Sequence, residues 1–287
     1  MIEYPQHKKL SDEYIIDKIA DFLAEDIPNG DITTESTTPD NSEITAEIHA
    51  VEKLVFAGSE IIPHCFGQNC QVTINHKNGA MLSKGDVIGV VTGSAREILS
   101  RERVMLNLIQ RLCGIATLSH EYAEIAKPSN VKILDTRKTT PGLRLFEKYA
   151  VAIGGAFNHR LNLSDGILIK DNHIVAAGSV TNAIISARKK GIHLPLELEV
   201  DNFDQIHEAL KTGVDGFLLD NMKPETIRSA VSIIRASQNG EDVFIEASGE
   251  ITLENIHLYL DTGINAISIG ALTHQAVSKN IRLDFIS

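Results

Sequence analysis

The C-terminal half of the chain repeats one pattern of apolar and polar positions. A short apolar run ends in a polar residue and is followed by a helix-like segment that closes on glycine. Six runs have this form: VKILDT (131–136), GILIKD (166–171), LELEVD (196–201), GFLLDN (216–221), VFIEAS (243–248) and AISIGA (266–271). Because their starts are separated by about one strand, one helix and two loops, the pattern predicts parallel strands joined by helices.

Segments between the runs carry the signals of helix ends. Ser179 is a suitable N-cap for the segment that follows it, and Pro224 suits the first turn of a helix. Thr252 can cap a further helix, over 252–262, that would stop at Gly263. We therefore predict a helix after each of these three residues.

Polar residues at the ends of the runs decide between two folds that share this alternation. A barrel brings the carboxyl ends of all its strands to one mouth, whereas a doubly wound sheet uses mainly those beside its switch point. Nearly every run ends in chemically useful residues: Asp135, Arg137, Lys138, Lys170, Glu199, Asp201, Asp220, Glu246, Ser248 and Gly270. With six clear runs, we predict an α/β protein whose residues 116–274 form an incomplete, irregular parallel barrel.

Residues 1–115 follow a different pattern. Alternating runs at 46–58, 70–82 and 86–98 predict antiparallel strands with glycine-containing turns. Helices are expected near 11–25 and 99–112. The alternating residues of the last segment, 275–287, are expected to return and pair with this N-terminal domain.

Charge along the chain is uneven. The whole chain carries −11, yet seven Lys or Arg stand against three Asp or Glu between Lys132 and Lys170. This local reversal predicts a pocket for a small polyanion, whereas nucleic acid would need a broad basic face.

No stretch approaches a membrane span or a signal peptide, and three scattered cysteines fit a reducing compartment. We therefore expect a cytoplasmic protein.

Five basic groups are expected to converge on the barrel mouth: Arg137, Lys138, His159, Arg160 and Lys170. Arg137 and Lys138 could instead be salt-bridge partners for the acidic strand ends. Together the five groups exceed what the nearby acids require, and arginine suits carboxylates while lysine suits phosphates.

Acidic and glycine-rich strand ends complete the candidate site. Glu199 and Asp220 end neighbouring runs and could hold Mg²⁺, or could pair with Lys138 and Lys170. Turns after the last two runs lie where barrels commonly bind phosphate, and they contain Ser248, Gly249, Gly270 and His274.

These residues lie in segments that resemble one family closely, the quinolinate phosphoribosyltransferases, also called nicotinate-nucleotide pyrophosphorylases (carboxylating). The matching stretches are EDIPNGDITT (25–34), ERVMLNLIQRLCGIAT (102–117), DTRKTTPGLRLFEKYAVAIGGAFNHR (135–160), LIKDNHI (168–174), LELEVDN (196–202), LLDNM (218–222), EASGEIT (246–252) and SIGALTH (268–274). The resemblance implies an N-terminal α/β sandwich domain and an irregular α/β barrel. It also implies a homodimer whose sites are completed across the interface, and it is compatible with higher homo-oligomers.

The resemblance also implies a reaction and a role for each candidate residue. Quinolinate attacks phosphoribosyl pyrophosphate with Mg²⁺, giving nicotinate mononucleotide, pyrophosphate and carbon dioxide in de novo NAD synthesis. The two quinolinate carboxylates would be held by Arg137, His159, Arg160 and, from the partner subunit, Arg103. The sugar, pyrophosphate and metal would be bound by Lys138, Lys170, Glu199 and Asp220. The 5′-phosphate would be bound by Ser248, Gly249 and Gly270.

Two departures and three alternatives accompany the resemblance. Glu250 stands where a second glycine of SGG is frequent, and Ala156 replaces a third glycine of GGG. A homologue encoded beside molybdate transporters shares the fold, but the intact DTRKT and KDNH segments argue against it. Nicotinate phosphoribosyltransferase would prefer a monocarboxylate. A non-catalytic anion-binding protein could lose Glu199 or Asp220, and both are present.

Overall fold

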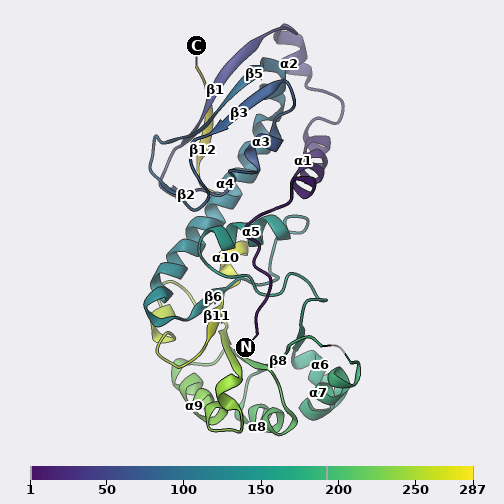
Figure 1. The fold of residues 1–287 in the computed structure, drawn as a ribbon, viewed down its shortest axis with the longest axis vertical. Coiled ribbons are helices and arrows are strands. Elements are labelled where there is room, and N and C mark those ends of the chain that lie inside the picture. Colours follow the sequence, from purple (N-terminus) through teal and green to yellow (C-terminus); the bar gives the residue numbers. More distant parts are fainter. Residues whose placement is uncertain (1, 192, 287) are drawn as a thin grey trace. The chain divides into compact units, whose positions relative to one another are not determined.

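The structure is a computed structural model that describes residues 2–191 and 193–286. It divides into two compact units, which Figure 1 colours along the chain. The N-terminal unit comprises His7–His120, Leu145–Gly155 and the C-terminal residues from Gln275. The barrel unit comprises the chain up to Gln6, Glu121–Arg144 and Ala156–His274. Each unit therefore draws on both of the ranges 1–115 and 116–274.

A four-stranded antiparallel sheet forms the centre of the N-terminal unit. Its order is β12-β1-β5-β3, and the C-terminal strand β12 pairs with β1 along its length. The runs predicted at 46–58 and 70–82 are each interrupted, and their second parts pair as the short sheet β2–β4. The strands are β1 (Glu43–Ala50), β2 (Leu54–Val55), β3 (Cys70–Ile74), β4 (Met81–Leu82), β5 (Val87–Ser94) and β12 (Ile281–Ile286).

Five helices contribute to this unit, and one of them is longer than expected. The prediction near 99–112 was too short, because α4 runs from Ala95 to Ala126. Gly114 lies inside the helix, where a Cβ would meet the Val277 carbonyl oxygen at 2.2 Å. This glycine therefore permits close backbone packing and does not end the helix. The other helices are α1 (Asp12–Asp26), α2 (Ile32–Thr37), α3 (Ile62–Cys65) and α5 (Arg144–Ile153).

All six runs of the C-terminal half are strands of one parallel sheet, as predicted. The order is β6-β11-β10-β9-β8-β7, so the sheet curves like a barrel, and in the described part of the chain no strand pairing joins β6 to β7. The strands are β6 (Lys132–Leu134), β7 (Ile167–Ile169), β8 (Leu196–Val200), β9 (Gly216–Asp220), β10 (Phe244–Ser248) and β11 (Ala266–Ser268). Parallel pairing brings their carboxyl ends to one edge.

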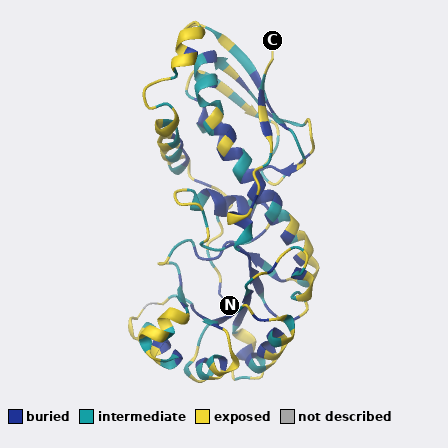
Figure 2. Cartoon of the chain, turned by 180° about the vertical axis from the view of Figure 1, so that it is seen from behind, coloured by how far each residue is buried: buried dark blue, intermediate teal, exposed yellow. Residues whose placement is uncertain are grey.

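Helices cover the outside of these strands, with exposed outer faces and buried strands in Figure 2. Ser179 accepts the Asn182 N–H as the N-cap of α7, and Pro224 is the first residue of α9, as predicted. The elements are α6 (Asp171–Ala177), α7 (Val180–Lys189), α8 (Phe203–Thr212), α9 (Pro224–Arg235), α10 (Ala271–His274) and the 3₁₀ turns η1 (Lys127–Ser129), η2 (Gly240–Asp242) and η3 (Ile256–Leu258).

The helix predicted over 252–262 was wrong. Only η3 forms there, within a series of turns. The Asn255 side chain accepts the Thr252 N–H at 2.8 Å and donates to the Glu250 carbonyl at 3.0 Å. These local bonds compete with helical hydrogen bonding.

An N-terminal segment, residues 2–6, packs in the barrel unit. Ile2 is buried with Leu134, Phe244 and Ala266, and Tyr4 packs against the same cluster. In Figure 1 this segment runs among the barrel strands. Among the described residues no helix is long and apolar enough to cross a membrane.

Candidate active site

The carboxyl ends of the barrel strands carry nearly all of the predicted site residues. Parallel register places Ser248 beside Asp220 on one side and beside Ser268 on the other. We call the residues at this edge the rim: Arg137, Lys138, Lys170, Glu199, Asp220, Ser248, Gly249, Gly270 and His274. Arg103 is an exposed residue of α4 and belongs to the N-terminal unit.

Two arginines from different segments of the barrel unit interact electrostatically. Arg160 is 5% exposed, and its guanidinium donates to the Gly166 carbonyl at 2.8 Å. Burial lowers the pKa of Arg160, and the nearby positive charge of Arg137 lowers it further. The Nε of Arg137 is buried and has no hydrogen-bond acceptor. A pair of neighbouring guanidiniums with an unused buried donor suits an anion with several oxygens.

Lys170 and Glu199 form an ion pair across neighbouring strands, after β7 and on β8. This is one of the pairings that the sequence left open. Asp220, at the end of β9, accepts a hydrogen bond from Asn221 at 2.9 Å. Carboxylates from two adjacent strands beside a partly open rim provide the oxygen donors that Mg²⁺ takes together with substrate phosphates. The residues present therefore fit this ion.

Lys138, Gly270 and His274 meet at the rim although they come from distant parts of the sequence. A Cβ on Gly270 would lie 2.9 Å from Lys138 Cδ and 3.1 Å from His274 Nε2. Thr273 also donates its hydroxyl to the Lys138 carbonyl at 2.7 Å. Glycine at position 270 thus leaves room for two basic side chains next to the first turn of α10.

The turn after β10 is tightly constrained. Gly249 has a φ of +103°, and a Cβ there would meet Asn221 Oδ1 at 2.1 Å. Glu250 follows with a φ of 45°, in the left-handed region that favours glycine. The backbone at this position therefore has a conformation suited to the glycine that the family resemblance suggests, while the Glu250 side chain is exposed.

Inside the barrel lies a second group of polar residues, which we call the inner cluster: Tyr4, His159, Glu197 and Glu246. His159 is 6% exposed, and its Nε2 lies 3.5 Å from Glu197 Oε2 and 3.6 Å from Glu246 Oε2. Both glutamates are 0% exposed, and their oxygens have no hydrogen-bond donor of normal geometry. The buried Tyr4 hydroxyl is likewise unpaired.

Burial changes the acidity of this cluster. Loss of solvent raises the pKa of Glu197 to about 7, and the Arg160 charge opposes that rise. Burial also raises the pKa of Glu246 to about 7, and the Glu197 charge adds to the effect. The hydroxyl of Ser268 acts in the opposite direction on Glu246. Both carboxyl groups therefore keep their protons to a higher pH than an exposed glutamate does.

His159, Glu197 and Glu246 are residue types that bind metals, and their ligand atoms lie within 4.8 Å of one another. The protonation of His159 argues against a metal here. Its Nδ1 accepts the Arg160 backbone N–H at 2.7 Å, so the proton of the neutral ring is on Nε2. A protonated Nε2 donates toward the two glutamates and has no lone pair for a metal.

Three contributors to this arrangement were missed by sequence reasoning. Glu197 lies two residues before Glu199, so both share one face of β8, and this spacing was the available signal. Tyr4 and Gln6 gave no signal, because their partners lie about 150 residues away. Asp135, noted only as a strand-end residue, accepts from the Asn158 side chain at 2.7 Å and the His159 N–H at 2.9 Å.

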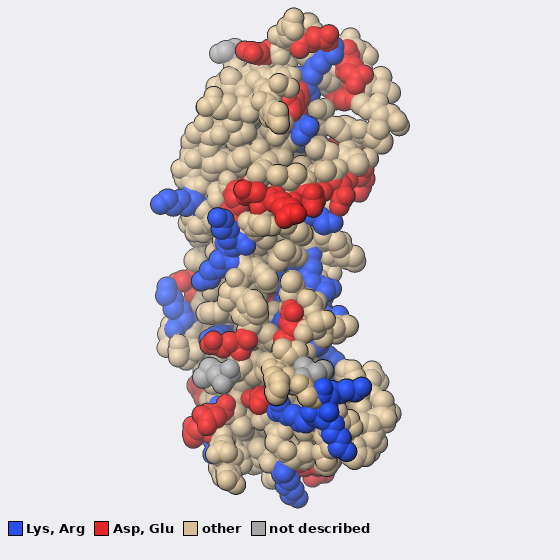
Figure 3. Space-filling view, turned by 45° about the vertical axis from the view of Figure 1, so that its right-hand side comes forward, with Lys and Arg blue, Asp and Glu red and all other residues tan. Residues whose placement is uncertain are grey.

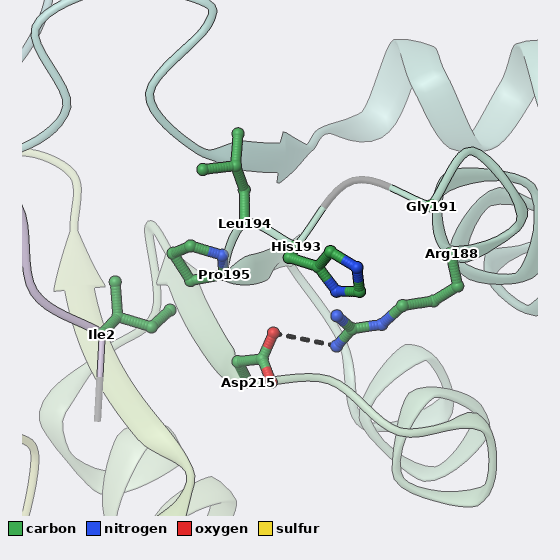
Figure 4. A pocket seen from close by; sticks show the side chains of 7 residues that line it. All are labelled: Ile2, Arg188, Gly191, His193, Leu194, Pro195 and Asp215. Atoms are coloured by element: carbon green, nitrogen blue, oxygen red, sulfur yellow. Dashed lines mark hydrogen bonds and ion pairs between the residues drawn. The ribbon is translucent and has the colours of Figure 1, made fainter.

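A cavity of about 570 Å³ lies elsewhere in the barrel unit. Figure 4 shows it beside Pro195, Asp215 and Arg188, whose guanidinium pairs with Asp215 at 2.8 Å. Pro195 and Asp215 directly precede β8 and β9. The cavity is therefore at the amino ends of the strands, opposite the rim.

Charged side chains occur in separate groups. On the face drawn in Figure 3, groups of Lys and Arg alternate with groups of Asp and Glu.

Comparison with known proteins identifies the family of the chain. The family models for the N-terminal and C-terminal domains of quinolinate phosphoribosyl transferase match residues 31–113 and 115–284. A probable nicotinate-nucleotide pyrophosphorylase (carboxylating) of Bacillus subtilis (strain 168) is 45% identical over 267 residues, or 92% of this chain and 90% of that protein. The Mycobacterium leprae (strain TN) nicotinate-nucleotide pyrophosphorylase (carboxylating) is 38% identical over 93% of this chain and 96% of its own length.

Solved structures give the same result. The nicotinate-nucleotide pyrophosphorylase of Francisella tularensis superimposes with a TM-score of 0.91 at 34% identity, over 99% of this chain and 100% of that one. The chain therefore belongs to the quinolinate phosphoribosyl transferase family.

Proposed function

We propose that the rim transfers the phosphoribosyl group of phosphoribosyl pyrophosphate to the ring nitrogen of quinolinate. Loss of one carboxylate as carbon dioxide then yields nicotinate mononucleotide, a step of de novo NAD synthesis. Family membership and the names of the relatives support this reaction. Within the site, the observation that carries it is the pair of neighbouring guanidiniums, Arg137 and Arg160, with an unused donor on Arg137.

Quinolinate carries two carboxylates, which matches this excess of positive charge. Arg137 and Arg160 would each take carboxylate oxygens through their planar forks. His159 bonds to the Arg160 backbone N–H through Nδ1, so its ring fixes the main chain that carries Arg160. A monocarboxylate would leave part of this cationic pair unpaired, which is costly for partly buried charges.

Displacement of pyrophosphate leaves positive charge on the ribose and negative charge on the leaving group. Lys138 and His274, which meet at Gly270, would stabilise the phosphate oxygens, and Lys170 adds a further cation. Glu199 and Asp220 would hold Mg²⁺, which neutralises pyrophosphate charge when bound. The turn at Ser248 and Gly249 would receive the 5′-phosphate. The quinolinate nitrogen is the nucleophile, so no side chain has to form a covalent bond.

Decarboxylation follows from the product of that transfer. The new bond gives the ring a positive charge, which stabilises the carbanion left when the C2–carboxylate bond breaks and its electron pair stays on C2. One proton then adds to C2, and the carboxylate leaves as carbon dioxide. Arginines that orient the remaining carboxylate would keep the ring in place through both steps.

A homodimer with shared sites is part of this proposal, with higher oligomers compatible with it. Arg103 is exposed on α4 and has the chemistry of a third carboxylate ligand. We propose that it is supplied by the partner subunit. We also propose a cytoplasmic location, since Cys65, Cys70 and Cys113 are all free thiols.

Product analysis of the purified protein tests the reaction. With Mg²⁺, phosphoribosyl pyrophosphate and quinolinate, we expect nicotinate mononucleotide and pyrophosphate in equal amounts. A chelator should stop turnover, and added Mg²⁺ should restore it. Absence of product from quinolinate at every Mg²⁺ concentration would reject the assignment.

A further inference from the structure

We propose that two residues of the N-terminal segment, Tyr4 and Gln6, are positioning residues of the active site, which hold the segment Phe157–Arg160 in its substrate-binding conformation. Tyr4 acts through His159 and Arg160 and does not itself touch substrate, so it is a positioning residue. This inference rests on the proposed function of the rim, because it assigns Arg160 to the quinolinate carboxylates.

The Gln6 side chain makes two hydrogen bonds to the backbone of Asn158, as a neighbouring strand would. Its side-chain amide donates to the Asn158 carbonyl at 3.0 Å, and its side-chain oxygen accepts the Asn158 N–H at 2.8 Å. On the other side, Phe157 pairs with β6 through its N–H to the Ile133 carbonyl, at 2.8 Å. The segment Phe157–Arg160 thus lies between β6 and Gln6. This is the side of β6 on which, among the described residues, no strand of the sheet pairs with it.

Tyr4 contacts two supports of the substrate-binding groups. Its ring stacks on His159 with centroids 4.7 Å apart and an angle of 24° between the planes. The same ring packs against Gly166, where a Cβ would lie 2.9 Å from Tyr4 Cε1. Gly166 is the residue whose carbonyl accepts the Arg160 guanidinium. Loss of the Tyr4 ring would therefore free both His159 and the backbone that anchors Arg160.

Two other sets of contacts made by His159 explain why stacking has a geometric effect. Nδ1 is bound to the Arg160 N–H, and Nε2 faces Glu197 and Glu246. These contacts are made by the ring nitrogens, whereas Tyr4 stacks on the face of the ring. Without that restraint the ring could tilt, and the main chain before Arg160 would follow through the Nδ1 bond.

Ile2 offers a matched control in the same segment. It is 5% exposed and packs with Leu134, Phe244 and Ala266 in an apolar cluster. Ile2→Ala should lower stability through lost burial while leaving the contacts of Tyr4 and Gln6 in place. A purely structural role of the N-terminal segment would make Tyr4→Ala and Ile2→Ala behave alike.

The test compares steady-state kinetics and thermal unfolding of the full chain and its variants. Tyr4→Ala should raise the KM for quinolinate about tenfold, with the KM for phosphoribosyl pyrophosphate within about twofold of the parent value. Gln6→Ala should act in the same direction. Tyr4→Phe should match the parent, because it keeps the stacked ring and loses only a hydroxyl without a hydrogen bond. Ile2→Ala should lower the Tm and keep both KM values.

An unchanged quinolinate KM in Tyr4→Ala, with a fall in Tm like that of Ile2→Ala, would overturn the proposal. If Tyr4→Ala does not fold, Tyr4→Leu, which keeps apolar volume, and Gln6→Ala decide in the same way. Equal changes of both substrate KM values would also count against it. A parent protein inactive on quinolinate would reject the proposed function instead, so the two failures are distinguishable.

Discussion

The rim and the inner cluster use the same residue types in opposite ways. At the rim, Glu199 is partly exposed and paired with Lys170. Two residues earlier on the same strand, Glu197 is fully buried beside His159 and Glu246, and its pKa is raised to about 7. Position along a barrel strand therefore decides whether a carboxyl group forms an ion pair at the rim or is buried with a raised pKa.

Arg160 links the two regions. Its backbone N–H bonds to His159 of the inner cluster, and its guanidinium lies close enough to Arg137 for the two charges to interact. In the proposed function the rim binds and transforms substrate, whereas the inner cluster sets the geometry from which the rim acts. Changes at the rim should therefore affect turnover most, and changes at the two buried glutamates of the inner cluster should be visible mainly in stability.

The largest effect is expected from Arg137→Ala. The kcat/KM for quinolinate should fall by about 10²- to 10³-fold, because one substrate carboxylate loses a charged, two-pronged partner. Arg228→Ala is the matched control, since Arg228 pairs with exposed Asp261 on the surface at 2.6 Å and should change kcat/KM by less than about twofold. Steady-state kinetics checks both. A similar small change in the two variants would remove Arg137 from the substrate site.

Mixing two inactive variants tests whether the rim is completed by a partner subunit. Arg103→Ala and Lys138→Ala should each abolish most activity alone. In a mixed dimer, one site combines an intact Lys138 with an intact Arg103, so activity should partly return after subunit exchange. Exchange is verified by differently tagged chains. Verified heterodimers that stay inactive would contradict a shared site.

The smallest effect is expected in the inner cluster, as a pH dependence of stability. The folded-state pKa of Glu246 is about 7, above its ordinary value of 4.5. The unfolded chain therefore releases this proton first as the pH rises. Below about pH 4.5 Glu246 is protonated in both states and does not lower the free energy of unfolding. Between about pH 4.5 and 7 this free energy should fall by roughly 2 to 3 kcal/mol.

Glu246→Gln should remove that fall, because the amide resembles the protonated carboxyl and does not titrate. Glu241→Gln, at an exposed position, serves as the control and should keep the slope of the parent. Denaturant unfolding at several pH values measures the difference. Parallel curves for the parent and Glu246→Gln would show that Glu246 is already ionised in the fold.

The rim and the inner cluster also differ in how well the sequence predicts them. The six strands and the polar residues that follow them were predictable, because each is a local pattern and parallel pairing brings the ends together. The interior position of Glu197 was not predictable, because the alternation in LELEV is equally typical of a strand with an outward acidic face. Only the curved sheet makes that face an interior.

Other features depended on contacts that no local pattern contains. Tyr4 stacks on a residue more than 150 positions later, and Gly114 remains helical because a distant backbone packs against it. Residues 252–262 have helical periodicity, yet the Asn255 side chain competes for the backbone. Tertiary packing and side-chain hydrogen bonds overrode the local signal in each case.

Competition between two pyridine substrates tests the central claim most directly. The protein would receive Mg²⁺, phosphoribosyl pyrophosphate, nicotinate and quinolinate labelled in its C2 carboxylate. If the arginine pair selects a dicarboxylate, one labelled carbon dioxide should appear for each nicotinate mononucleotide, and the nicotinate should remain unused. Formation of nicotinate mononucleotide from nicotinate, without release of label, would contradict the account.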